Sequence, residues 1–202
     1  MGATSNPAEI CNMAIGALGQ TSFIESLDDA GNPTAEICNL HYDRARRNAL
    51  QFFPFEFAVK RVALDESSEE PPAAWAYAYA WPTDCLRPLN IDTELQIDNI
   101  EQLVPFRVEN AGSARVIYTD MDSAVLRYVF DCTDTLIWTE AFIDYLAIVM
   151  AARIAMPLTS NMDLSQKMEQ LARLRGYAAV ASSASNIQTG ELPDAGVIRA
   201  RE

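Results

Sequence analysis

The most apolar stretch of the chain, residues 141–156, constrains the fold more than any other feature. Its only charged residues are Asp144 and Arg153. We expect it to form a helix that begins near Thr139 and stops at Pro157, because proline ends most helical patterns. The stretch is shorter than the roughly 20 residues that cross a membrane. It therefore predicts a buried helix at the centre of a core.

Two earlier helices begin at matching signals. Asn6 and Asn32 can each cap a helix, and each is followed by a proline suited to the first helical position. Glu9 completes a capping box with Asn6, while Gly19 and Pro54 are expected to end the two helices. Apolar residues at helical spacing predict one buried face on each helix: Ile10, Cys11, Ala14, Ile15 and Leu18, then Cys38, Tyr42, Ala45 and Ala49.

The middle of the chain changes to the two-residue period of strands. Trp75, Tyr77, Tyr79 and Trp81 alternate with alanines, which predicts a strand with all four aromatic rings on one covered face. Further strands are predicted over residues 104–108, 114–118 and 124–130, with turns at residues 110–113 and 120–123. We expect these segments to form a small antiparallel meander.

Together the elements predict an α+β fold that is mostly helical. We expect a four-helix bundle that holds a small antiparallel β insertion between its second and third helices. The helical parts are residues 1–53 and 135–184, the insertion is residues 54–134, and residues 1–184 form a single domain. Residues 185–202 lack periodicity and predict a flexible C-terminal docking tail.

Composition and charge narrow the function. The chain has 28 acidic and 15 basic residues, a formal net charge of −13. Such a surface repels DNA phosphates and anionic lipid, so we expect no tight DNA binding and no membrane partner. The four cysteines are far apart and His41 is the one histidine. No metal site, cofactor or catalytic residue is therefore predicted.

Arg44, Arg46 and Arg47 form the densest basic cluster of this acidic chain. Arg44 and Arg47 share one predicted helix face, with Glu36 and Asp43 nearby. Two interpretations stay open: surface ion pairs within the subunit, which stabilise little, or a contact to an acidic patch on a neighbouring subunit. Arg44 and Arg47 are therefore candidate partner-binding residues.

The tail combines polar residues with spaced aliphatic side chains that could fill pockets on a partner. Ordering it costs about 1–2 kcal/mol per residue, but a ring that presents many tails together would bind strongly. A disordered end without a role is the alternative. The candidate partner-binding residues of the tail are Ile187, Leu192, Val197 and Ile198.

Three groups of strings, covering the first half of the chain, resemble the tail tubular protein A family, the head-to-tail adaptor of podoviruses. They are IGALG at residues 15–19 with SLDD at 26–29, CNLHYDRARR at 38–47 with FPFEFA at 53–58, and WAY at 75–77 with WPTDCLR at 81–87. Their order and spacing are similar to those of the family. The family often has tryptophan where this chain has Phe55.

The resemblance implies a structural subunit without enzymatic activity. It implies a dodecameric ring of identical subunits seated between the portal protein and the tail nozzle protein, with DNA passing through the lumen without specific binding. The subunit would be made in the cytoplasm of a bacterial host and end in the virion neck. Two alternatives stay open: a small virion-associated hydrolase, a lysin with a carboxylate pair, and a helical regulator.

Truncation after Ala184 tests the tail. The shortened chain should remain folded, because the predicted helices and strands precede the cut, and should lose attachment to portal assemblies, because the aliphatic anchors are gone. Co-sedimentation with portals measures attachment, and circular dichroism checks the fold. Equal attachment of the truncated and full-length chains would make the tail a bystander.

Overall fold

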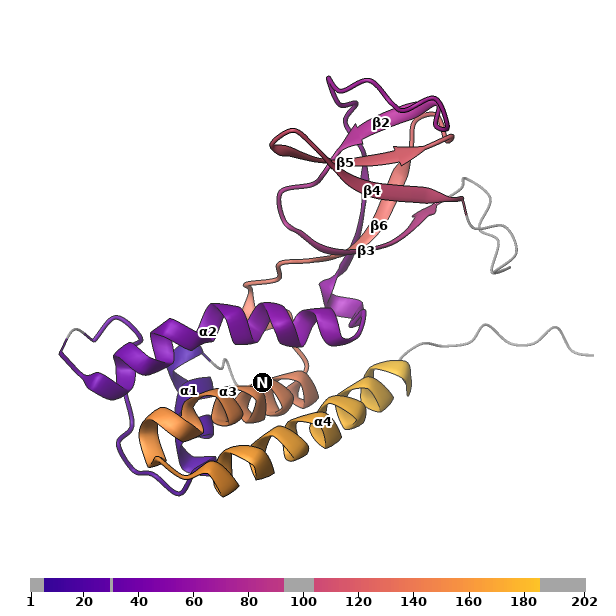
Figure 1. Ribbon diagram of the computed structural model, residues 1–202. Coiled ribbons are helices and arrows are strands. Elements are labelled where there is room, and N and C mark those ends of the chain that lie inside the picture. Colours follow the sequence, from indigo (N-terminus) through magenta and orange to yellow (C-terminus); the bar gives the residue numbers. More distant parts are fainter. Residues whose placement is uncertain (1–5, 30, 93–103, 186–202) are drawn as a thin grey trace, which may run out of the picture.

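The computed structural model describes residues 6–29, 31–92 and 104–185. The chain has a mixed α+β fold in which a layer of helices carries a β module (Figure 1). The helices are α1 (Pro7–Ala17), α2 (Pro33–Phe52), α3 (Glu140–Thr159) and α4 (Met162–Ser185). The strands are β1 (Val59–Ala63), β2 (Tyr77–Ala80), β3 (Cys85–Asp92), β4 (Phe106–Ala111), β5 (Ala114–Thr119) and β6 (Val125–Phe130). Two short 3-10 helices, η1 (Glu56–Ala58) and η3 (Thr135–Ile137), lie in the connections.

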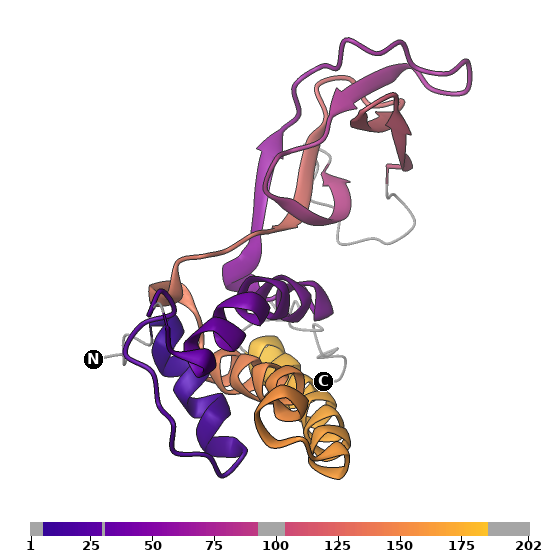
Figure 2. The same ribbon diagram turned by 60° about the vertical axis from the view of Figure 1, so that its left-hand side comes forward.

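Helix α3 is the centre of the helical layer, as its apolar sequence predicts. Helices α1, α2 and α4 each pack against it, and Figure 2 shows α1 and α4 on opposite sides of it. Its fully buried side chains include Phe142, Leu146, Met150 and Ile154. Burying a side chain of this size stabilises the fold by about 1.5–3 kcal/mol, so this helix contributes strongly to the hydrophobic stabilisation of the layer.

The expected stop of this helix at Pro157 is wrong. The helix continues to Thr159, whose hydroxyl donates to the Ala155 carbonyl at 2.6 Å. Ser160 then ends it in the left-handed conformation, at φ 51°. Pro157 removes one amide donor, the one that would bond the Arg153 carbonyl, and the helix ends soon after it.

The expectation that this segment is too short to cross a membrane is also wrong. Helix α3 has 20 residues and a mean hydropathy of 1.7 over its most apolar window, which is long and apolar enough to span a bilayer. Half of that window is buried inside the molecule. We therefore describe α3 as the core helix of the layer.

The predicted helix starts are confirmed by their capping bonds. The Glu9 amide donates to Asn6 Oδ1 at 2.9 Å, and the Asn6 amide donates to Glu9 Oε2 at 3.0 Å. Asn32 and Thr139 accept from amides in the first turns of α2 and α3. Both predicted apolar stripes are buried, because helical spacing places each stripe on one face.

The β module corrects the expected four-helix bundle with a small insertion. It contains two three-stranded antiparallel sheets, in the orders β1-β6-β3 and β2-β5-β4, instead of one meander. It also has a core of its own, whose largest members are Tyr79, Ile91, Ile117, Leu126 and Tyr128. The module projects from the helical layer (Figure 1). Alternating hydrophobicity predicts strands but does not say which strands pair, so the pairing of β6 with β1 and β3 could not be predicted.

Strand β3 is not among the predicted strands; it contains Pro88, and a proline in sequence argues against a strand. The structure tolerates the proline because β3 lies at the edge of its sheet. The pairing with β6 is also irregular between Pro88 and Asn90. Edges and irregularities are the places where a strand loses least from a missing amide donor.

The aromatic stripe is only partly as predicted. Tyr77, Tyr79 and Trp81 contribute to the same cluster of the β module. Trp75 precedes β2 and packs with Ala78 in a separate cluster. The two-residue period applies only inside the strand, so it does not place the ring of Trp75.

Replacing Leu146 with Asp tests the central place of α3. Leu146 is fully buried, and an unpaired buried charge costs several kcal/mol, a large share of the stability of a domain. We expect Leu146→Asp to be insoluble, whereas Leu146→Met, which conserves volume, should lose less than about 1.5 kcal/mol. Soluble yield and urea unfolding measure both variants, and a normally folded Leu146→Asp protein would contradict this account.

Candidate functional site

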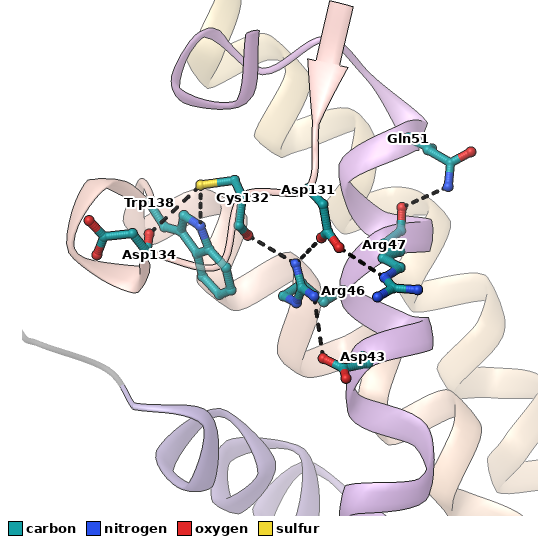
Figure 3. A network of polar contacts seen from close by, with 8 residues as sticks. All are labelled: Asp43, Arg46, Arg47, Gln51, Asp131, Cys132, Asp134 and Trp138. Atoms are coloured by element: carbon teal, nitrogen blue, oxygen red, sulfur yellow. Dashed lines mark hydrogen bonds and ion pairs between the residues drawn. The ribbon is translucent and has the colours of Figure 1, made fainter. Parts of the chain in front are cut away.

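The junction between the helical layer and the β module is built around one buried arginine (Figure 3). Arg46 on α2 is 3% exposed. Its Nη1 donates to the Cys132 carbonyl at 3.1 Å and also bonds the Asp131 carboxylate, while Nη2 donates to Asp43 at 3.3 Å. Asp131 and Cys132 directly follow β6. Arg46 therefore ties the exit of β6 to α2.

Asp131 receives a second arginine. Arg47 Nε donates to Asp131 Oδ2 at 3.0 Å, so each carboxylate oxygen holds one guanidinium. Burial alone would lower the pKa of Arg46, but the hydrogen bond and the negative charge of Asp131 outweigh it and raise the pKa. Arg46 stays charged, because its cost of burial is offset by acceptors on both parts of the molecule.

The chain from Cys132 to Trp138 is fixed against the helical core. Trp138 Nε1 donates to Cys132 Sγ at 3.3 Å, and the Leu136 amide donates to Asp134 Oδ1 at 3.0 Å. The buried Trp138 ring packs edge-on against Phe142, with 5.2 Å between the ring centroids. This anchoring leaves the apolar side chains of η3 facing outward.

Other carboxylates of the β module pair with cations. Lys60 binds Asp84, Arg61 binds Asp92, and the Tyr128 hydroxyl donates to Asp84 at 2.9 Å. Burial opposes ionisation of Asp84, but the hydrogen bonds from Lys60 and Tyr128 outweigh it, so the pKa of Asp84 is lowered. The general acid of a glycoside hydrolase needs a raised pKa, so Asp84 has the wrong shift for that role.

A groove lies between α2 and α4, with α3 as its floor. Its volume is about 610 Å³. Val149, Ala152 and Met156 of α3 line it, together with Phe52 from α2 and Ala172 from α4. The groove exists because α3 is apolar on most sides but has only three helical neighbours among the described residues.

Gly176 brings α4 close to α2 and α3 beside this groove. A Cβ atom at Gly176 would lie 2.9 Å from Phe52 Cε1 and 3.0 Å from Tyr145 Cε2, closer than side chains normally approach. Phe52 and Tyr145 both line the groove. The absence of a side chain at Gly176 therefore sets how near α4 lies to the groove wall.

Positive charge gathers around the groove. Arg153 and Arg173 line it together with His41 and Glu169. Within the described part of the chain, Arg44, Arg153 and Arg173 make no ion pair. Burial lowers the pKa of His41, and the charges of Arg153 and Arg44 lower it further. Among the described residues these three arginines therefore have no ion-pair partner, although the carboxylate of Glu169 also lines the groove.

The residues singled out from sequence fall in different places. Arg47 is tied to Asp131 and remains about half exposed, whereas Arg44 is exposed and lies near His41 of the groove. Four candidates of the tail lie outside the described residues: Ile187, Leu192, Val197 and Ile198. Sequence reasoning missed Asp131, since nothing local links it to α2. It also missed the groove arginines, although Arg153 is the one cation in the most apolar stretch.

Replacing Arg46 with Ala tests the junction. The variant removes the buried donor of the Cys132 carbonyl and leaves Asp131 with Arg47 as its one arginine, and breaking a buried pair costs up to about 3–5 kcal/mol. Urea unfolding should show this loss. Arg44→Ala is the matched control, since Arg44 is exposed and makes no ion pair with a described residue, and it should change the free energy of unfolding by no more than about 0.5 kcal/mol. Equal stability of the two variants would remove Arg46 from the centre of the junction.

Comparison with protein families and curated proteins assigns no function to the chain. No family model matches the chain, and no curated protein matches it. The resemblance to the tail tubular protein A family therefore remains a prediction. Three of its strings lie at ends or junctions of structural elements. IGALG ends α1, CNLHYDRARR contains the junction residue Arg46, and FPFEFA leads from α2 into β1.

Proposed function

We propose that this chain is a structural head-to-tail adaptor subunit of a short-tailed phage. Identical copies form a ring, dodecameric by resemblance, between the portal protein and the tail nozzle protein. The proposal is supported by the ordered strings of the first half of the chain. It assigns the subunit no catalytic residue, metal or cofactor, and places it in the virion neck after synthesis in the cytoplasm of the host.

The observation that carries the proposal is the two-part shape of the subunit. A β module with its own core projects from a helical layer, and Arg46 holds the two parts together. Such a subunit can present one part to each of two different partners. In a ring, the helical layers can contact one another while the β modules contact the portal or the nozzle.

The charge of the chain suits a channel through which DNA moves. A net charge of −13 repels phosphate, and tight DNA binding depends on neutralising many phosphates with Lys and Arg. A ring of such subunits would let DNA slide without holding it. The proposed contact with DNA is therefore passage through the lumen.

Imaging with the cognate portal tests the proposal. The full chain is mixed with the portal protein encoded in the same genome, and the product is examined by electron microscopy beside the portal alone. We expect an added ring of density on one end of the portal, with the portal's symmetry. Absence of added density at saturating concentration would overturn the proposal. So would clearing of host peptidoglycan in a zymogram that a single carboxylate substitution abolishes.

A further inference from the structure

The α2–α4 groove leaves one face of the core helix incompletely covered. Helix α3 is apolar on most sides, and its neighbours α1, α2 and α4 cover three of them. Along the groove, Val149 and Ala152 are only partly buried and Met156 is 38% exposed. Apolar surface of this kind gains free energy when a further element covers it.

The arginines at the groove favour an occupant that carries negative charge. Arg153 and Arg173 line it, Arg44 lies near it, and none of the three pairs with a carboxylate of the described residues. One carboxylate, Glu169, is part of the lining. In a chain with a net charge of −13, an apolar groove with unpaired arginines suits an occupant that combines aliphatic side chains with carboxylates.

The same chain carries a segment with that chemistry. In η3, Leu136 is 70% exposed and Ile137 is 47% exposed. The exposed carboxylates of Asp134 and Glu140 lie on either side of them in sequence. We call residues 134–140 the acidic knob. Because Asp134 and Trp138 hold it in place, binding would cost little ordering entropy.

The knob and the groove lie on different sides of the helical layer. The chain that leaves β6 reaches α3 on the side of α1, whereas α4 and the groove lie across α3 (Figures 2 and 3). A knob on one side and its complement on the other make a head-to-tail contact, and such contacts close into rings when the rotation between copies allows it.

We propose that the acidic knob of one copy docks into the α2–α4 groove of a second copy. Leu136 and Ile137 cover the exposed face of α3, and Asp134 and Glu140 pair with the groove arginines. The inference deepens the proposed function, on which it rests, by naming the contact between neighbouring subunits of the ring.

Two variants that each disable one half of the contact test it. Arg173→Glu reverses a groove charge and Leu136→Asp removes an exposed knob anchor; both positions are exposed, so folding should be unaffected. Each variant alone should self-associate at least about tenfold more weakly than the natural chain in sedimentation equilibrium. Arg175→Glu is the matched control, since it makes the same change on the same helix outside the groove, and it should behave as the natural chain.

Mixing the two variants gives the decisive result. The Leu136→Asp chain keeps its groove and the Arg173→Glu chain keeps its knob, so an equal mixture can form one intact contact. We expect heterodimers that grow no further. Where the natural chain associates measurably, variants that associate as it does, or a mixture that shows no heterodimer, would overturn the proposal.

Cysteine trapping covers the case in which association is weak. A Leu136→Cys chain is mixed with a Met156→Cys chain and oxidised; the natural cysteines are all buried. A mixed disulfide dimer is expected. Met13→Cys is the matched control, because Met13 is 40% exposed but lies on α1, and it should give little dimer. The proposal would be overturned if the natural chain is monomeric and the Leu136→Cys and Met156→Cys chains give no mixed dimer. It would also be overturned if Met13→Cys is trapped equally well.

Two further outcomes identify other occupants and separate this inference from the proposed function. If removing residues 186–202 abolishes association while Leu136→Asp does not, the tail fills the groove and the proposal fails. If Arg173→Glu chains still build complete rings on portals, the adaptor function stands and this contact is wrong. If the knob–groove dimer forms but the chain never joins a portal, the contact stands and the adaptor function is wrong.

Discussion

Arg46 joins the helical layer to the β module, and because it is buried it needs hydrogen-bond acceptors around it. A buried guanidinium costs several kcal/mol unless acceptors surround it. Here Asp43 comes from the same helix, while Asp131 and the Cys132 carbonyl come from the exit of β6. Because β6 is the central strand of the β1-β6-β3 sheet, holding its exit holds that sheet. The planar fork of arginine, with several donors, can reach these acceptors together.

The segment that receives Arg46 also shapes the outer surface. Cys132 accepts from Trp138, and Trp138 packs into the helical core against Phe142. These contacts turn the intervening chain so that Leu136 and Ile137 point outward. The connection that fixes the β module thus also presents the acidic knob, which links the folding of a subunit to its proposed contact with a neighbour.

The incomplete coverage of α3 affects both the core of the subunit and its outer surface. Helices α1, α2 and α4 bury most of its apolar surface, and the space left between α2 and α4 is the groove. The arginines around that groove remain without internal partners among the described residues. In the proposed assembly, carboxylates of a second copy pair with these arginines. A subunit of this kind would complete its core and its charge pairing by assembling.

The sequence alone determined the features that depend on neighbours in the chain. The capping bonds of Asn6 and Asn32 and the buried stripes of α1 and α2 follow from local chemistry and helical spacing. Tertiary structure decided the rest. Distant segments are joined in the two separate sheets, in the pairing of the strand that contains Pro88, and in the ion pair of Arg46 with Asp131, which lies 85 residues away in sequence. Periodicity reports which face of an element is apolar, whereas the partner of that face is chosen by packing across the whole chain.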